Sequence, residues 1–296
     1  MGKHKNRNRS VAKYSRENTE LIKILEQLLD LTVQDVSEIP RDLLENFTRI
    51  RTLVERAKSL EKKFDEVPAR SEKGMRELVD WGIRRGCFVR GVQVRCLKGL
   101  GPDEYGVFCT DSLQDSDIFL SVPLDLMLTS DHALERSGTL SPLLRSDAIC
   151  SGMSNICLSL LLLNELAKNE ESFWQKYICC LPSRYCTILY FNEDEMRLLS
   201  GSATLEEACK MYRSITRQYA YFKKKILTEP KWKEQPAARL FTYEAYSSVI
   251  DEGVYSSLVK QAGVLCALAA YRKKRGNDYE KRMVFLHVWR IDIKVY

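Results

Sequence analysis

The chain has 296 residues, of which 45% are hydrophobic and 29% charged, and its formal net charge is +6. This length allows one large domain or two modest ones, and the composition is that of an ordinary globular protein. Much of the positive excess lies in residues 1–18, where no acid precedes Glu17. We predict a disordered basic tail there, with a nuclear address or an anion-binding arm as the alternative. The near-neutral remainder makes nucleic-acid binding an unfavoured function.

Signals for targeting, membranes and metals are weak. The basic start is not followed by the apolar core of a signal peptide, and the longest apolar run, Ile156 to Leu163, is much shorter than the ~20 residues that span a bilayer. A myristoylation motif is rejected because Asn6 stands where Ser or Thr is needed. The ten cysteines form no C-x-x-C pair and the three histidines are scattered. We therefore expect free thiols, no metal, no membrane and a cytoplasmic location, with the nucleus as an additional one.

Residues 19–86 are predicted to form an N-terminal helical region. One amphipathic helix begins at Thr19 as its cap, and a second follows Pro40. A third, short helix ends at one of the glycines before Cys87. Because Pro40 interrupts the apolar pattern, two helices that pack on the main body are favoured over a coiled coil.

Residues 87–130 change character and are predicted to be a small β region. Three short stretches alternate between apolar and polar side chains or are rich in β-branched and aromatic residues: "FVRGVQVRCL", "EYGVFCT" and "DIFLSVP". The polar stretch "DSLQDS" is the predicted turn between the second and the third.

Residues 131–246 are predicted to be helical again, so the fold class is α+β. Residues 143–169 form one strongly apolar helix, and residues 204–230 a long amphipathic one. Between them lie two short helices separated by the strand-like "ILYF". His132 is interpreted as a surface residue near a helix start, and nothing in the sequence supports a Cys–His nucleophile pair.

Four stretches, in this order and at these distances, resemble one known family. They are "EYGVFCTDSLQDSDIFLSVPLDLMLT", "SFWQKYICCLPSRYCTILYFNEDEMRLLSGS", "RQYAYF" and "FTYEAY". The resemblance is to SET-domain methyltransferases with a helical insert, which include the Rubisco lysine methyltransferase type. It is strongest to the branch that methylates a histidine of actin, and it runs from about residue 45 to Tyr246. It implies the first half of a SET-type β fold in residues 87–130, with residues 131–246 as the insert.

This resemblance also implies a cofactor and its contacts. The family uses S-adenosylmethionine, and the segment that meets the methionine end of the cofactor corresponds to Asp103, Glu104 and Tyr105. Glu104 replaces the first of two glycines that the family shows around the aromatic residue. Arg70 is the candidate for a basic residue that contacts the cofactor, and Arg217 for an arginine of the peptide groove. Actin is the implied protein substrate.

The residues that carry the family's catalysis find no match. The resemblance ends at Tyr246, and residues 247–296 are predicted to be a divergent C-terminal tail. Ser256 stands where the family has an arginine, and His287 lacks the preceding asparagine. We therefore name no catalytic residue and expect a truncated protein-histidine N-methyltransferase, inactive on its own. The alternative is a non-catalytic module that binds actin or another partner through the insert.

The divergent tail leaves two interpretations open. The stretch "SSLVKQAGVLCALAAYRKKR" is helix-like and "RMVFLHVWRIDIKVY" alternates like a strand, so the tail could partly cover the incomplete β region. The favoured interpretation is an unselected end. Without a cover, the strands between residues 88 and 122 would have unpaired edges and exposed apolar faces.

Overall fold

The structure is a computed structural model that describes residues 2–61, 70–96, 105–113, 118–182, 187–250, 272–275, 278–281 and 284–285. The chain forms two compact units. Unit 1 comprises Met1–Phe64 and Cys186–Ser248, and unit 2 comprises Asp65–Tyr185 and Val249–Tyr296. These units differ from the boundaries predicted along the sequence. The predicted helical regions 19–86 and 131–246 are each divided between the two units.

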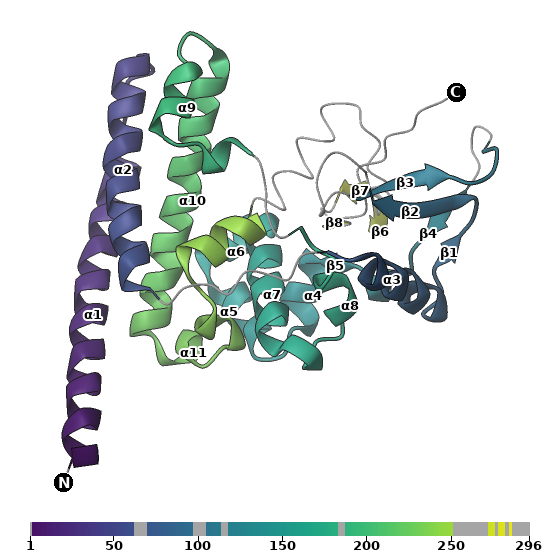
Figure 1. Cartoon of the computed structure of the whole chain (residues 1–296), viewed down its shortest axis with the longest axis horizontal. Helices are drawn as coiled ribbons and strands as arrows, with labels where there is room; N and C mark the ends of the chain where they lie inside the picture. Colours follow the sequence, from purple (N-terminus) through teal and green to yellow (C-terminus); the bar gives the residue numbers. More distant parts are fainter. Residues whose placement is uncertain are drawn as a thin grey trace. The chain divides into compact units, whose positions relative to one another are not determined.

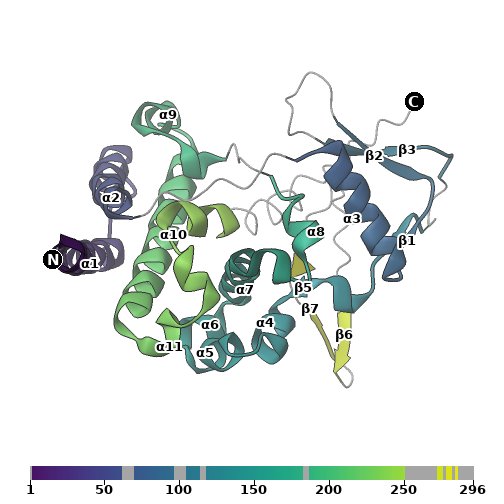
Figure 2. The same ribbon diagram turned by 60° about the horizontal axis from the view of Figure 1, so that its bottom comes forward.

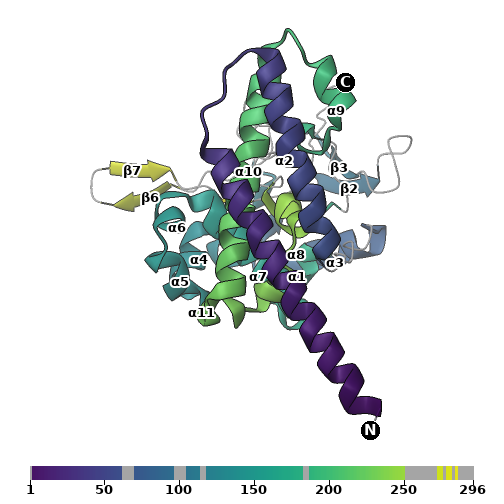
Figure 3. The same cartoon turned by 90° about the vertical axis from the view of Figure 1, so that its left-hand side faces the viewer.

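The only secondary structure in the described residues of unit 1 is helical. Its elements are α1 (Gly2–Val33), α2 (Pro40–Leu60), η3 (Ile188–Tyr190), α9 (Glu193–Leu198), α10 (Ala203–Thr228), α11 (Pro230–Lys233), η4 (Pro236–Arg239) and a helix that begins at residue 243. The long helices α1, α2 and α10 lie side by side, as Figure 1 and Figure 3 show from two directions. Helices α1 and α2 thus form the predicted helical pair, and both pack against α10.

The first helix corrects the expectation of a disordered tail. Residues 2–18 belong to α1, and Thr19, predicted as its cap, lies inside it. The physical reason is that no proline or glycine interrupts residues 3–33. Leu21, Ile24 and Leu28 are buried, and a helix that is nucleated by such packing extends at little cost through lysine, arginine and alanine.

The core of unit 1 is rich in aromatic rings. The rings of Phe47 in α2 and Tyr212 in α10 are 4.8 Å apart between centroids. Further along α10, the Tyr219 ring stacks on Phe241 at 6.2 Å. Tyr246 is completely buried, and its ring lies 5.1 Å from that of Phe241. The aromatic segment 241–246 is therefore anchored on α10.

In the stretch "ILYF", predicted as strand-like, Ile188–Tyr190 is the 3-10 helix η3. The backbone groups that follow η3 form hydrogen bonds with side chains rather than with another strand. The carbonyl of Phe191 accepts a hydrogen bond from Arg51 at 2.8 Å. The Asn192 side chain caps α9 in a capping box with Glu195. Local capping thus decides the structure of a stretch whose composition suits a strand.

Unit 2 contains the described strands. They are β1 (Phe88–Val89), β2 (Val92–Cys96), β3 (Tyr105–Cys109), β4 (Leu120–Ser121), β5 (Leu128–Thr129), β6 (Arg272–Arg275), β7 (Asp278–Lys281) and β8 (Val284–Phe285). Among the described residues they pair antiparallel in twos: β1 with β4, β2 with β3, β5 with β8, and β6 with β7. The three predicted strand regions between residues 88 and 123 each contain such a strand.

The helices of unit 2 are mostly short. They are α3 (Glu72–Arg84), η1 (Leu124–Leu126), α4 (Ser130–Arg136), α5 (Leu140–Ser146), α6 (Ala148–Gly152), α7 (Ser154–Lys168), η2 (Asn169–Glu171) and α8 (Gln175–Ile178). Figure 2 separates α4 to α7 in the bundle that they form. The single apolar helix predicted over residues 143–169 is wrong. Asp147 ends α5 and caps α6 through the amides of Ile149 and Cys150, and α7 begins only after Gly152.

The C-terminal tail agrees only in part with the helix-like and the strand-like stretches that were predicted for it. Residues 256–271, predicted to be helix-like, lie outside the described residues. Arg272–Arg275, placed at the end of that helix, is strand β6 and pairs with β7 in the register Arg275↔Asp278. The sequence signal for this hairpin was Gly276-Asn277, a dipeptide that suits a two-residue turn. The first residues of "RMVFLHVWRIDIKVY" include β8, as its alternation predicts.

Candidate functional site

A cavity of about 410 Å³ lies within unit 2. It is enclosed by helix α3 and by the strands that were predicted as the start of a SET-type fold, and Figure 2 shows α3 beside β2. Most of the side chains that line it are apolar. They include Met75, Leu78, Val92, Val94, Tyr105, Val107, Phe119, Leu120, Val122, Leu126, Met127 and Leu128.

The alternation of β2 and β3 explains why this cavity is apolar. Residues directly opposite each other in an antiparallel pair lie on the same face, and Val94 pairs with Val107. On the same face, two positions further along β2, Cys96 pairs with Tyr105. The face of the hairpin that carries these residues packs against Met75 of α3. The predicted strands therefore form one wall of the cavity.

The structure brings together two of the predicted cofactor residues, Arg70 and Tyr105. The Arg70 guanidinium carbon lies 5.8 Å from the centroid of the Tyr105 ring, a cation–π distance. Tyr105 is 6% exposed and packs with Met75 and Cys180. Burial raises the pKa of the Cys180 thiol to about 12, so it is protonated at neutral pH and is no nucleophile there.

The other predicted site residues are placed differently or fall outside the described chain. Asp103 and Glu104 lie outside the described residues, directly before β3. Arg217 is exposed on α10 in unit 1. Each of these three assignments stays a prediction.

The packing of His132 was not predicted from the sequence. Predicted as a surface residue, it is half-buried in α4, and its ring meets Trp174 edge-on at 4.9 Å. The Trp174 indole donates a hydrogen bond to the carbonyl of Leu126 at 3.0 Å. Burial lowers the pKa of His132, with a further lowering by the charge of Arg136. No local signal reveals this packing, because Trp174 is 42 residues away in the sequence.

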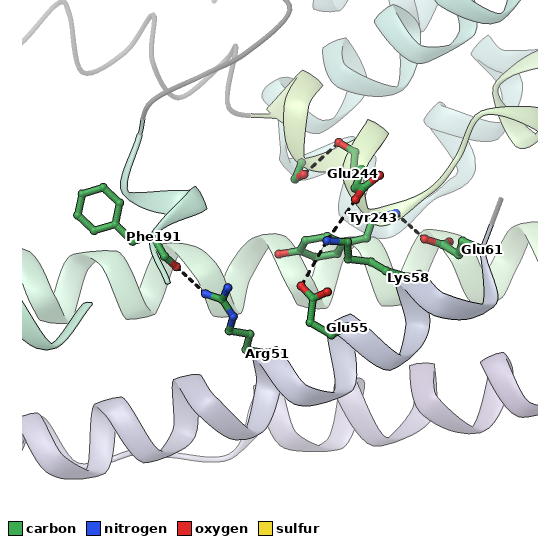
Figure 4. A network of polar contacts seen from close by, with 8 residues as sticks. Arg51, Glu55, Lys58, Glu61, Phe191, Tyr243 and Glu244 are labelled. Atoms are coloured by element: carbon green, nitrogen blue, oxygen red, sulfur yellow. Dashed lines mark hydrogen bonds and ion pairs between the residues drawn. The ribbon is translucent and has the colours of Figure 1, made fainter. Parts of the chain in front are cut away.

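A buried polar network holds the aromatic segment of unit 1. Glu61 accepts hydrogen bonds from the Tyr219 hydroxyl and the Tyr243 amide, both at 2.9 Å, and pairs with Lys223 at 2.8 Å. The Glu61 and Lys223 side chains are only 3% and 11% exposed. Figure 4 shows the Glu61–Tyr243 bond beside the more exposed pair of Lys58 and Glu244. The network fixes the end of α2 to the start of the helix at residue 243.

Among the residues that the structure describes, no group of three or more His, Cys, Asp or Glu side chains could hold a metal ion. No helix in the described ranges is long and apolar enough to cross a membrane.

The chain is similar to curated proteins over 68% of its length. No profile of a known protein family matches the chain. Over 203 residues, however, the chain is 37% identical to the actin-histidine N-methyltransferase of Papio anubis and 36% identical to that of Homo sapiens. The chain is a homologue of the actin-histidine N-methyltransferases. The family resemblance predicted from the sequence is thereby confirmed.

The match covers 33% of the length of each of these relatives, so the homologous part spans about a third of their length. Among solved structures, the SET domain of LSMT bound to lysine and AdoHcy is similar with a TM-score of 0.52, over 73% of this chain and 43% of that chain. At 16% identity this likeness shows the fold alone. It confirms the predicted α+β class with SET-type elements.

Proposed function

We propose that this homologue carries the cofactor-contacting part of an S-adenosylmethionine-dependent protein-histidine N-methyltransferase. Its relatives are named for methyl transfer to a histidine of actin. The similar SET domain was solved with AdoHcy, the product form of that methyl donor. The reaction moves a methyl group from the donor's sulfonium to an imidazole nitrogen, which gives up its proton.

The contact between Arg70 and Tyr105 is the observation that carries the proposal. The methionine end of the cofactor combines a carboxylate with a sulfonium cation. A guanidinium binds a carboxylate through charge-assisted hydrogen bonds, and an aromatic ring attracts the guanidinium itself. The Arg70 guanidinium lies over the ring of Tyr105, a residue that the resemblance assigns to the methionine end. The residues present therefore fit this part of the cofactor, with Arg70 binding the carboxylate and the Tyr105 ring orienting the guanidinium.

The residues that carry the family's catalysis find no match in this sequence, in which Ser256 stands in place of an arginine and His287 lacks the preceding asparagine. We therefore propose that these 296 residues bind the cofactor without transferring methyl groups on their own. Alignment of donor and acceptor would then need residues beyond those matched here.

Isothermal calorimetry with AdoHcy tests the proposal. We expect binding to the wild-type chain and a loss of about tenfold or more for Arg70→Ala, because an ionic hydrogen bond is removed. Arg85→Ala is the matched control, since the Arg85 guanidinium also lies over a ring, that of Phe173 at 5.1 Å. Undetectable binding to the wild type at millimolar AdoHcy would refute the proposal. Equal effects of the two substitutions would refute the role of Arg70.

Actin as the partner is the finer part of this proposal. The exposed position of Arg217 on α10 leaves its charge accessible to a protein surface, which also suits the alternative of a non-catalytic binding module. Pull-down of actin by the wild-type chain without cofactor tests it, with recovery reduced severalfold by Arg217→Ala. Lys231→Ala, which removes another exposed positive charge of unit 1, is the control. Unchanged recovery with Arg217→Ala would remove Arg217 from the partner surface.

A further inference from the structure

An exposed surface between α3 and α8 brings positive charge and aromatic rings together. The two helices lie side by side within unit 2, as Figure 2 shows. The ring of Phe173, just before α8, lies 5.6 Å from that of Trp81 in α3. Lys176 of α8 forms an ion pair with Glu77 of α3 at 2.5 Å. Because the numbering rises along one segment as it falls along the other, the two segments run antiparallel and share a surface.

The α3 side of this surface is one face of the helix. Residues spaced by three or four positions share a face, and from Glu77 this spacing leads forward to Trp81 and Arg84. It also leads back to Lys73. Arg85 follows directly, and its guanidinium lies 5.1 Å from the centroid of the Phe173 ring. This face and residues 173–176 together are called the α3–α8 seam.

Positive charge is in excess along the α3–α8 seam. Glu77 pairs with Lys73 at 3.9 Å as well as with Lys176, and both Arg84 and Arg85 are exposed. Four cations therefore stand beside one carboxylate, an excess of three positive charges. The hydrogen bond with Glu77 raises the pKa of Lys176, whereas the charge of Arg84 opposes this rise, because the two cations repel each other. An anion bound at the seam would relieve this repulsion.

Phe173 adds an apolar contact to the α3–α8 seam. This residue is 41% exposed, a large fraction for an aromatic side chain. Trp81 and Trp174 meet its ring at steep angles, with centroids 5.6 and 5.3 Å away, and Arg85 lies over the ring. These neighbours hold the ring in place, so a partner that covers it loses little additional side-chain entropy.

We propose that the α3–α8 seam binds an acidic protein segment that carries an apolar side chain. The acidic residues of the partner pair with the cations of the seam, and its apolar side chain covers the Phe173 ring. A nucleic acid is a less suitable partner, because Arg85 already lies over the ring on which a base would stack. The chain outside its basic first 18 residues is also nearly neutral. The proposal depends neither on methyl-donor binding at Arg70 nor on the partner surface at Arg217.

Fluorescence anisotropy with the full chain tests the proposal. The probe is a fluorescein-labelled peptide in which glutamates flank one central tryptophan. We expect binding that weakens as the salt concentration rises. Replacing both Arg84 and Arg85 with glutamine should weaken it by about fivefold or more at low salt, because two charges of the seam are lost.

The matched control removes two other exposed arginines of unit 2. Arg76 lies on another face of α3 and pairs with Glu72 at 3.9 Å, and Arg95 lies on β2. Replacing both with glutamine changes the net charge equally and should alter peptide binding by less than about twofold. Circular dichroism reports whether each variant is folded. Equal losses in the two double variants would overturn the proposal, because binding would then follow net charge alone.

Two measurements on the wild-type chain do not depend on the folding of any variant. Undetectable peptide binding at low salt would overturn the proposal, and so would tighter binding of a single-stranded oligonucleotide of equal charge. A benzoylphenylalanine in place of the tryptophan of the peptide should crosslink to residues 173–176 or 81–85. Crosslinks confined to other parts of the chain would also overturn the proposal.

Discussion

The two units of this chain are stabilised in different ways. In unit 1 the backbone hydrogen bonds of α1, α2 and α10 are closed within each helix, and the core adds aromatic rings and a buried ion pair. In unit 2 the strands are two to five residues long, and some depend on partners distant in sequence, as β5 depends on β8. A helix forms its backbone hydrogen bonds internally and needs neighbours only to bury its apolar face. A strand also needs neighbours as partners for its backbone hydrogen bonds. Among polar contacts, we expect the largest contribution to the free energy of unfolding from the one that involves a buried charge, and this contact lies in unit 1.

The largest expected effect is the loss of the buried carboxylate in unit 1. Glu61→Ala should lower the free energy of unfolding by about 3–5 kcal/mol, because the ammonium group of Lys223 then stays buried without its counter-charge. Denaturant unfolding measures this change, with exchange in α10 peptides assigning it to unit 1.

An exposed ion pair of the same unit provides the control. Glu244 pairs with Lys58 at 3.2 Å, but its side chain is 51% exposed. Glu244→Gln should cost less than about 1 kcal/mol, since water and salt screen such a pair. Similar losses for Glu61→Ala and Glu244→Gln would show that burial does not set the strength of these contacts.

A helix cap in unit 2 should have an intermediate effect. The Asp147 side chain accepts hydrogen bonds from the amides of Ile149 and Cys150 at 3.0 and 3.2 Å. Asp147→Ala should destabilise unit 2 by about 1–2 kcal/mol, whereas Asp147→Asn keeps an acceptor oxygen and should cost less. Thermal unfolding of the two variants checks this order. A cost for Asp147→Asn as large as that for alanine would mean that the charge, and not the cap, is what counts.

The same contrast explains how much of the fold was predictable. Helices α2 and α10 follow from apolar positions at helical spacing, and β2 and β3 from alternation, because these signals are local. The break at Asp147 and the extension of α1 to Gly2 were missed, since capping and propagation from a packed segment override composition. The pairing of β5 with β8 has no local signal at all.

The candidate site was predictable only where a motif accompanied it. Tyr105 and Arg70 were both identified from the resemblance. Their cation–π contact is a property of the folded chain. Val94 and Val107 were predicted as strand residues, but that they enclose a cavity depends on how α3 packs on the hairpin. Asp103 and Glu104 stay predictions, because they lie outside the described residues.

The smallest expected effect is a pH dependence of unit 2 that arises from His132. Burial beside Trp174 and the charge of Arg136 lower its pKa, while the charges of Asp125 and Glu165 raise it by less. A pKa below the ordinary value means that the fold favours the neutral ring. The stabilisation is therefore present above the unfolded-state pKa of about 6.5 and is lost as the pH falls below it. Urea unfolding at pH 7.5 and 5.5 measures this loss, which should be smaller for His132→Gln than for the wild type. An equal loss in both proteins would assign the pH dependence to other groups and leave His132 as a packing residue only.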